Sequence, residues 1–561
     1  MKTIRELIEK ETYEHIEYYL SLVDKYGEDF IFEGQRAMDD PAKFVKAILL
    51  YNATVLYLYY LKTGDERAEK ALTLIKKFVK LCCRDYFKTW GKLYILRAMI
   101  KLDNAGMLDI IPSEDIEILK EITNYEDMLD KKEMKLLCGR PSNYFHVAMG
   151  CAGLRELLGW DTEPFCDNIK AKLLSIMENA SDNGYMDEEP PYGRFDRYSM
   201  LLTSEFCDTL GLIKKEAPKY VLDNLEHVTK ICVKMANEKG DGVNYGRSLS
   251  CHGDGAILEI FSTAFAKGLV AKEDMDVALL YSIRLAEKQL NFWYDRERRS
   301  YNLWWDGRST NSYRGVKRVL EVNMDMASHM LEVLHNFEMA GLADTLPNID
   351  QLPCPENWEA TELAFSVKED SVAKTIILRR KDTLVMLPLV GLGNYYMHAP
   401  YLPYPNICGV IEAAPEGAYP FLIPQYKTAQ GELYRPIQFF TDVKTECSNE
   451  SITVIAEGKL TKLGGTHPEK SEYSFKTTYN FCGDDLCAEF VTDLAEAEIE
   501  MLVGWHRDDF TITTTGFDTQ KEEIVDGVES FKTPAGAITR AVSYTAQKAG
   551  KVSYKITLAE C

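Results

Sequence analysis

The sequence predicts a protein of two parts, an N-terminal (α/α) toroid and a C-terminal antiparallel β-sandwich. A chain of 561 residues is too long for a single hydrophobic core. Apolar residues recur at helical spacing from Ile4 to about Met339, and further along the chain they alternate with polar residues at a period of two. We therefore expect a catalytic toroid over 1–345, a proline-containing linker over 346–358 and a β-sandwich over 359–561.

The helical part shows a long series of apolar-periodic segments joined by loops rich in Gly, Pro, Asp and Asn. No strict repeat length of the tetratricopeptide kind is present, and this favours hairpins closed into a ring over an open solenoid. The expected helices are Lys43–Leu61, Glu66–Leu81, Lys92–Leu102, Glu114–Leu129, Phe145–Leu158, Phe165–Asn179, Arg197–Leu210, Pro218–Asn237, Asp254–Lys267, Ala271–Trp293 and Lys317–Met339, after a first helix that begins near Ile4.

The C-terminal part contains short runs of β-branched and apolar residues that alternate with polar ones. Gly, Asp and Asn separate the runs at hairpin spacing, which is typical of an antiparallel sandwich or barrel. The expected strands include Val372–Arg379, Thr383–Val390, Ile452–Leu460, Tyr473–Phe481, Ala488–Thr492 and Lys551–Leu558.

Net charge and apolar content exclude several classes of protein. The chain has 65 Lys and Arg against 87 Asp and Glu, a formal charge of −22, so its field would repel nucleic acid. The N-terminus lacks the apolar region of an export signal, and the most apolar stretch, Ala47 to Leu61, is interrupted by Asn52 and too short to span a bilayer. We expect a cytoplasmic protein without a membrane partner.

Cysteine spacing and nucleotide motifs give no sign of a bound metal or cofactor. The cysteines form no paired zinc signature, and we find no credible P-loop, Rossmann glycine fingerprint, zincin motif or nucleophile elbow. We therefore expect neither a metal nor a cofactor.

Four segments of the helical part combine polar and aromatic side chains between expected helices: 143–146, 184–198, 244–252 and 304–314. Loops on one rim of a ring of hairpins converge on its central cavity, so these segments can build one pocket. The segment 184–198 is the most acidic. Glycoside hydrolysis needs one protonated and one ionised carboxyl group, and this predicts general acid and base among Asp187, Glu188, Glu189 and Asp196.

The same segment also offers groups that would bind a substrate, namely Tyr192, Arg194 and Arg197. The alternative is an acidic surface loop whose arginines form exposed ion pairs of little energetic weight. Spacing alone leaves both interpretations open.

The segment 244–252 places a phenol, a guanidinium and an imidazole around a glycine. Arg247 is suited to clamp a carboxylate with two hydrogen bonds, and Tyr245 or His252 to move a proton. The alternative for His252 is an ordinary buried or surface histidine.

The remaining candidates are assigned to substrate binding. Asn143 and His146 stand at the start of a helix, and Trp304-Trp305 with Arg308 form an aromatic segment suited to stacking on a sugar ring. His398 lies in a proline-studded aromatic loop of the β part that is suited to reach over a neighbouring cavity. The alternatives are core packing for the tryptophans and domain packing for the loop.

Two of these segments resemble a bacterial family catalogued as domain of unknown function 2264. Its Phe-Asp-x-Tyr loop corresponds to Phe195–Tyr198, and its Gly-Arg-Ser-Leu-Thr-Tyr-Arg motif corresponds to Gly246–His252, where Cys251-His252 replaces Tyr-Arg. The family is similar to carbohydrate enzymes built from a toroid and a β-sandwich, among them toroidal β-glucuronidases and, more distantly, heparinase II/III-like lyases. The resemblance implies an enzyme that acts on a uronic-acid-containing or related glycan.

Three functions follow as hypotheses. The first is an exo-acting, β-glucuronidase-like hydrolase of small uronic-acid oligosaccharides, with arginines that recognise the sugar carboxylate and with a possible homo-oligomeric state. The second is a lyase that works by β-elimination, for which Tyr and His side chains would move the protons. The third is a non-catalytic glycan-binding protein, which would need aromatic platforms without titratable pairs.

Overall fold

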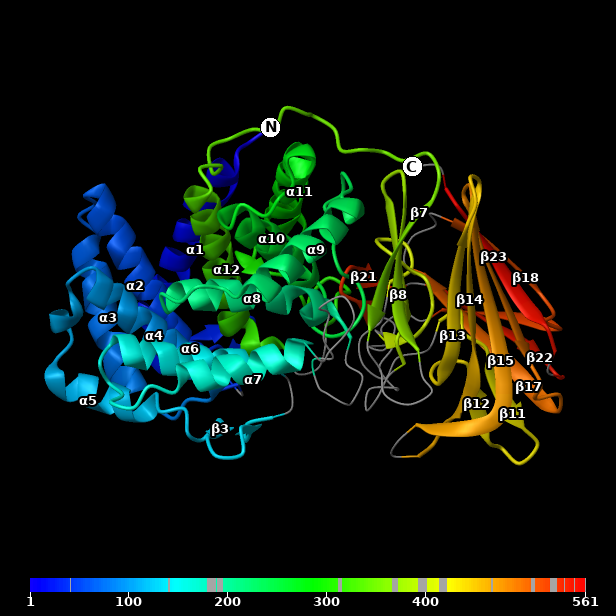
Figure 1. The fold of residues 1–561 in the computed structure, drawn as a ribbon, viewed down its shortest axis with the longest axis horizontal. Coiled ribbons are helices and arrows are strands. Elements are labelled where there is room, and N and C mark those ends of the chain that lie inside the picture. Colours follow the sequence, from blue (N-terminus) through cyan, green and yellow to red (C-terminus); the bar gives the residue numbers. More distant parts are fainter. Residues whose placement is uncertain are drawn as a thin grey trace.

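The computed structural model shows an (α/α) toroid followed by a β-sandwich, as the sequence predicts (Figure 1). Helices end at Met339, and the first strand of the sandwich begins at Glu359. The structure describes residues 1–40, 42–139, 142–178, 188, 195–310, 315–365, 372–391, 401–412, 421–465, 468–505, 510–524, 532–538, 540–548 and 550–559.

The described part of the chain contains twelve α-helices, all of them in the N-terminal part. Their bounds are α1 Ile4–Tyr26, α2 Val45–Thr63, α3 Ala68–Cys82, α4 Thr89–Asn104, α5 Ser113–Ile122, α6 Asn143–Leu157, α7 Cys166–Glu178, α8 Arg197–Leu212, α9 Lys219–Met235, α10 Cys251–Ala266, α11 Met275–Lys288 and α12 Val319–Met339.

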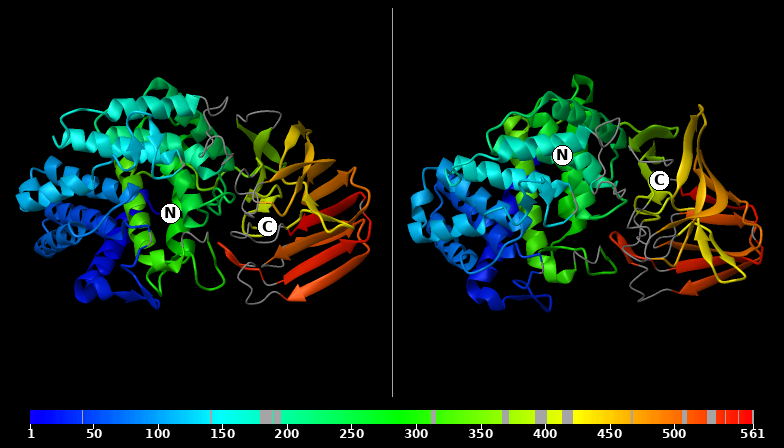
Figure 2. Two further views of the ribbon diagram at one scale, coloured as in Figure 1. Left: turned by 90° about the horizontal axis from the view of Figure 1, so that it is seen from below. Right: turned by 60° about the horizontal axis from the view of Figure 1, so that its bottom comes forward.

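The even-numbered helices form the inner layer of the ring. Each contacts the next, from α2 through α4, α6, α8 and α10 to α12, and α12 contacts α2 to close the ring. The odd-numbered helices pack outside them, for example α3 against α2, α7 against α6 and α1 against α12. The inner helix α10 is buried almost all round, whereas the outer helix α3 buries a single apolar face. Figure 2 shows the helices as one body with the strands beside it.

Buried polar side chains join the last inner helix to the first. Asn52 of α2 donates to the carbonyl oxygen of Met324 (3.2 Å) and to Ser328 Oγ (3.1 Å), both on α12. It also donates to the carbonyl of Ile48 in its own helix (2.9 Å). The asparagine that interrupts the most apolar stretch of the sequence therefore pairs the two helices that close the ring.

Two helices are shorter than the sequence predicts. α5 ends at Ile122 because Asn124 starts a turn, in which its side chain accepts a hydrogen bond from the backbone of Glu126 (2.9 Å). A short hairpin, β3 Leu129–Asp130 with β4 Lys135–Leu136, then follows. α11 ends at Lys288 and continues as one π-helical turn, Gln289–Trp293.

The β part consists of two antiparallel sheets. The smaller has the order β10-β9-β8-β7 and the larger has the order β18-β23-β16-β15-β14-β12-β11-β17-β22-β19, with β13 also paired to β14. Their bounds are β7 Glu359–Phe365, β8 Ala373–Arg380, β9 Thr383–Leu389, β10 Asn406–Ile407, β11 Gln425–Thr428, β12 Leu433–Arg435, β13 Phe440–Cys447, β14 Ser451–Lys462, β15 Glu469–Cys482, β16 Asp485–Thr492, β17 Ala497–Trp505, β18 Phe510–Thr515, β19 Thr519–Ile524, β22 Arg540–Ala546 and β23 Val552–Leu558. Further two-stranded pairs are β1 Ile31–Phe32 with β2 Gln35–Arg36, β5 Tyr294–Asp295 with β6 Ser300–Tyr301, and β20 Lys532–Thr533 with β21 Gly536–Ala537.

The small sheet lies between the toroid and the large sheet (Figure 1). Side chains of a strand alternate between its two faces. Ile377 of β8 and Met386 of β9 belong to the core of the helical part, whereas Ile376 and Val385 belong to the core of the sandwich. The small sheet is therefore buried on both faces and fixes the position of the sandwich against the ring.

Within the described residues, the helices are too short or too polar to cross a membrane.

Ring closure supplies a first testable prediction. Asn52→Ala should lower the free energy of unfolding by about 1–3 kcal/mol, because a buried network loses its central donor. Denaturant unfolding measures the change. Asn104→Ala, at the exposed end of α4, should change it by less than about 0.5 kcal/mol. Equal effects of the two substitutions would show that the Asn52 network does not hold the ring closed.

Candidate active site

Two cavities lie on the axis of the ring. The first has a volume of about 550 Å³ and the second about 490 Å³. Both are lined by Trp90, Glu205, Glu259 and His329, so these four side chains form a layer between them. The size of each cavity is that of a small-molecule site.

The six inner helices all run in the same direction along the axis of the ring. The first cavity is lined by residues at the N-terminal end of every one of them: Phe44, Lys88, Asn143, Arg197, His252 and Arg318. Each helix N-terminus carries a partial positive charge, from unpaired N–H groups and the aligned peptide dipoles. The first cavity is therefore favourable for an anion, although the whole chain is acidic.

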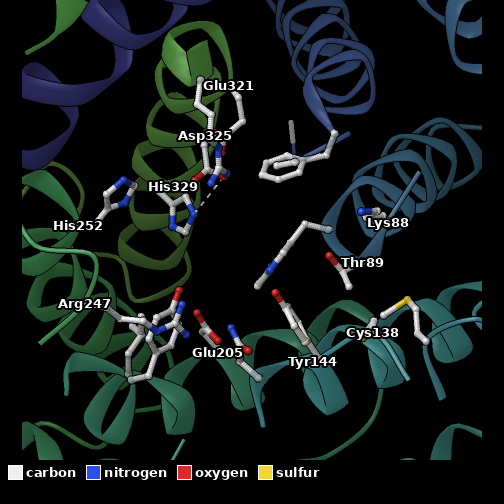
Figure 3. A pocket seen from close by; sticks show the side chains of 18 of the residues that line it. Lys88, Thr89, Cys138, Tyr144, Glu205, Arg247, His252, Glu321, Asp325 and His329 are labelled. Atoms are coloured by element: carbon white, nitrogen blue, oxygen red, sulfur yellow. Dashed lines mark hydrogen bonds and ion pairs between the residues drawn. The ribbon is translucent and has the colours of Figure 1, made fainter. Parts of the chain in front are cut away.

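A row of titratable side chains on α12 faces the first cavity. Glu321, Asp325 and His329 follow one another at a spacing of four residues and so lie on one face of the helix. Figure 3 shows this row on one side of the cavity and Glu205 with Tyr144 on the other.

His329 is held between two carboxylates. Its Nδ1 lies 3.0 Å from Glu259 Oε1, and its Nε2 lies 3.6 Å from Asp325 Oδ1. Burial alone would lower the pKa of His329, but the two carboxylates raise it well above its usual value. The imidazole is therefore a cation at neutral pH, and it fixes Glu259 and Asp325 in place.

Glu205 is the carboxyl group whose protonation is most altered. Burial, together with the nearby Glu259 carboxylate, raises the pKa of Glu205 to about 8. His146 supports the backbone here, because its Nε2 lies 2.6 Å from the Glu205 carbonyl oxygen. Burial lowers the pKa of His146 to about 4, so this imidazole is neutral. At neutral pH Glu205 carries a proton while Glu259 is paired with a cation.

Arg247 is fixed at the edge of the first cavity by a buried carboxylate. Its Nε donates to Glu188 Oε2 (2.8 Å) and its Nη2 to Glu188 Oε1, a two-point contact. Its guanidinium lies 4.3 Å from the centre of the Tyr198 ring. Arg247 Nη1 donates to no group among the described residues, so this nitrogen can donate a hydrogen bond to a ligand.

Asp196 holds the backbone on which Arg247 stands. It caps α8, accepting a hydrogen bond from the backbone of Tyr198 (3.0 Å). Gly246 packs so closely on it that a Cβ there would lie 2.2 Å from the Asp196 Cβ, and its φ is +84°. Only glycine fits this position without strain.

The β part completes this arrangement through Tyr401. The Tyr401 hydroxyl donates to Asp196 Oδ2 (2.6 Å) and accepts from the backbone N–H of Arg247 (3.1 Å). Phe195 and Phe365 stack nearby, with ring centres 4.4 Å apart. The position of Arg247 therefore depends on a residue of the sandwich.

Four of the candidates from the sequence line the first cavity: Asn143, Arg197, Arg247 and His252. The amide oxygen of Asn143 is buried and accepts no hydrogen bond from any described residue. Arg197 donates to the carbonyl of His252 (2.9 Å) and to the Tyr198 hydroxyl (3.0 Å). His146, a fifth candidate, lines the second cavity instead.

Other candidates take part in packing. Glu188 and Asp196 lie behind Arg247 as its anchors, and neither is among the described residues that line the cavity. The Tyr245 hydroxyl accepts from Thr375 of β8 (3.0 Å), so it faces the small sheet. Burial raises the pKa of Tyr245, and this disfavours a role as base.

Trp304, Trp305 and Arg308 also lie away from the described lining of the first cavity. The two indoles contact each other edge to face, with ring centres 5.4 Å apart, and Trp305 contacts Phe32 in the same way. Arg308 covers the ring of Phe292 at 4.2 Å. Asp187, Glu189, Tyr192, Arg194 and His398 lie outside the described residues.

Sequence inspection missed Glu205, Glu259, Asp325 and His329. They lie in the middle of helices, whereas most of the residues predicted from the sequence lie in loops or at helix starts. A signal was present in α12, where Glu321, Asp325 and His329 follow one another at a spacing of four residues and so share one face of the helix. Among the described residues, no group of three or more His, Cys, Asp or Glu side chains is arranged to hold a metal ion.

Comparison with solved structures shows a similar fold in a chondroitin AC lyase. The chondroitin AC lyase of Streptomyces coelicolor A3, solved with chondroitin sulphate, superposes with a TM-score of 0.51 at 11% identity, over 98% of this chain and 79% of that one. A possible GH105 member from Salmonella enterica gives a TM-score of 0.40 at 14% identity, over 60% of this chain and 96% of that one. The heparan sulfate lyase of Pedobacter heparinus gives 0.33 at 10% identity, over 100% and 84%.

No family model and no curated protein sequence matches this chain. The comparisons therefore show the fold of the toroid and sandwich, and they do not support the resemblance to domain of unknown function 2264 in particular.

The contact between Tyr401 and Asp196 supplies a second prediction. Tyr401→Phe should lower the free energy of unfolding by about 1–3 kcal/mol, because a buried carboxylate loses a donor. Tyr554 is the matched control: it is equally buried, and its hydroxyl bonds to no described residue. Tyr554→Phe should be neutral or stabilising in the same unfolding measurement. If both variants changed the free energy of unfolding equally, the contact between Tyr401 and Asp196 would not contribute to stability.

Proposed function

We propose that this protein is a glycoside hydrolase that acts on small saccharides containing a uronic acid, with its reaction centre in the first cavity. The observation that carries the proposal is the carboxyl pair at the floor of the cavity. Glu205 is protonated at neutral pH, and Glu259 is ion-paired with the His329 cation. A protonated carboxyl group beside an ion-paired acidic side chain is the arrangement that acid–base cleavage of a glycosidic bond requires.

In this proposal Glu205 is the general acid. Its carboxyl group would give a proton to the glycosidic oxygen as the bond to the anomeric carbon breaks. Its Oε2 is buried and makes no hydrogen bond with a described residue, and the neutral imidazole of His146 lies 3.8 Å from it. These roles replace the sequence-based assignment to Glu188 and Asp196, which are both engaged by Arg247.

Glu259 would serve as the second carboxylate, acting on water or on the anomeric carbon. His329 would keep it ionised and oriented, and Asp325 would hold the other side of the imidazole. His329 is therefore a positioning residue. The distance between the two carboxyl groups distinguishes retaining from inverting enzymes.

An anionic sugar suits the charge distribution of the first cavity. Six helix N-termini point at it, and Arg247 offers one unused N–H corner on a rigid guanidinium. Lys88, at the start of α4, is exposed and makes no ion pair with a described residue. We assign the sugar carboxylate to Arg247 with Lys88. The chondroitin AC lyase of the same fold acts on an acidic glycan, which agrees with this assignment.

The general acid gives the third prediction. Glu205→Gln should reduce release of chromophore from a chromogenic β-glucuronide by at least about 100-fold, because the proton donor is lost. At pH 7 this variant should be at least as stable as the parent, since glutamine avoids the cost of burying an acid that favours ionisation in the unfolded chain. Glu121→Gln, on the exposed surface of α5 and away from the described cavity lining, is the control and should retain activity within a few-fold. A fully active Glu205→Gln enzyme would remove Glu205 from the mechanism.

The fourth prediction concerns pH. Only protonated Glu205 can donate, and its pKa is about 8, so activity should be retained up to about pH 8. Above that it should fall about tenfold per pH unit in kcat/KM. A pH–rate profile of the parent enzyme measures this. A descending limb below about pH 6 would contradict the assignment of Glu205 as the acid.

A lyase is the second candidate, and Asn143 is the observation that favours it. β-Elimination begins with neutralisation of the uronate, and the buried, unpartnered Asn143 amide oxygen could accept the proton of a neutral sugar carboxyl group. His252 and Tyr144 line the same cavity and would move protons. Incubation with uronate polymers distinguishes the candidates, because elimination creates an ultraviolet-absorbing double bond and hydrolysis does not. Absorbance growth that is lost in Asn143→Ala but kept in Glu205→Gln would establish the lyase.

A further inference from the structure

The second cavity lies on the opposite side of the shared layer from the proposed reaction centre. It is lined by later turns of the inner helices, including Arg97 and Lys101 of α4 and His335 of α12. The two cavities divide α4 between them, because Lys88 at its start belongs to the first and Lys101 in its last turn to the second. A ligand in the second cavity would therefore meet a separate set of side chains.

Aromatic rings line much of this cavity. Tyr13 and Tyr59 stack with ring centres 3.7 Å apart, and Tyr51 and Tyr94 lie with ring centres 5.5 Å apart. Trp90 lines the end that meets the shared layer. Such faces suit a ligand with a flat or ring-shaped apolar body.

Lys101 is the polar group that this cavity leaves without a counter-charge. Its ammonium makes no hydrogen bond or ion pair with a described residue, and it lies 5.8 Å from the centre of the Tyr51 ring. Burial, together with the neighbouring Arg97, lowers the pKa of Lys101 to about 8. No carboxylate offsets these effects at Lys101.

The neighbours of Lys101 strengthen the need for an anion. Arg97 is occupied, because it pairs with Glu332 and lies 4.8 Å from the Tyr51 ring centre. His335 on α12 is close enough that Lys101 contributes to lowering its pKa. The cations Lys101 and Arg97 and the imidazole of His335 therefore face one region of the cavity. Glu332 pairs with Arg97, and Glu338 acts on His335, so neither carboxylate pairs with Lys101.

A simpler explanation is that the Lys101 ammonium interacts favourably with the negative, C-terminal end of the α4 dipole. By this explanation the second cavity, which is surrounded by helix C-termini and also contains Asp208 and Glu338, would attract a cation. The unpaired state of Lys101 argues against it, since a lysine that only satisfied the helix end would bond the last carbonyl groups. The charge of the preferred ligand decides between the two.

We propose that the second cavity is a separate binding site for a small organic carboxylate that carries a ring. The carboxylate would bind Lys101, with Arg97 and His335 beside it, and the ring would lie against Tyr51 and its neighbouring tyrosines. This site does not depend on which reaction occurs in the first cavity.

Calorimetric titration of the full-length chain with three matched probes tests the proposal. Benzoate, benzamide and benzylamine share a ring and differ in charge. We expect one benzoate per chain, bound at least about fivefold more tightly than either of the others. Lys101→Met should weaken benzoate about tenfold, since it removes a charge-assisted contact. Lys101→Arg should restore most of the affinity.

Lys88→Met is the control on the same helix, at the other cavity, and it should leave benzoate affinity unchanged. Loss of binding in Lys88→Met but not in Lys101→Met would place the anion in the first cavity and overturn the proposal. Tighter binding of benzylamine, equal affinity for all three probes, or no binding at all would overturn it as well. Thermal unfolding of each variant separates loss of the site from loss of the fold.

Discussion

The common direction of the six inner helices is the constraint on which the rest of the structure depends. Each hairpin returns the chain to the same rim, so all six N-termini surround the first cavity. Their dipoles add, and in a chain of formal charge −22 they favour an anion at this end of the axis. The later turns of most of these helices surround the second cavity, where lysines such as Lys62 and Lys101 stand in the last turns. One topological rule therefore places helix N-termini at one cavity and, at the other, helix C-termini with lysines beside them.

The charged groups inside the ring are stable because they bind one another. An isolated buried charge is costly, but a charge that is paired and hydrogen-bonded can remain ionised. His329 stays protonated between Glu259 and Asp325, and this in turn leaves Glu205 as the acid without a cationic partner. The raised pKa of Glu205 has burial as its main cause and the neighbouring Glu259 carboxylate as the next. Removal of His329 would be expected to disturb all three acids together.

The sequence predicted the architecture well and the site only in part, for a physical reason. Changes in hydrophobic period report burial directly, so the toroid and sandwich could be recognised from them. Asn143, Arg247 and His252 were found because they stand near helix starts, which converge on one rim. Glu205 and Glu259 were missed because a single sequence does not tell which face of a helix looks onto the axis. Glu188 was taken for a catalytic acid, whereas its carboxylate binds Arg247, a residue 59 positions away.

The site is not a property of the ring alone. Arg247 has two supports: Glu188 binds its guanidinium, and Tyr401 of the β part binds its backbone N–H. Tyr401 also donates to Asp196, the cap of α8, and α8 carries Glu205 two turns further on. The small sheet is buried on both faces, so it cannot shift against the ring without disturbing both cores. The sandwich thereby fixes the helix that carries the proposed acid and the arginine that would bind the sugar, and the two must move together.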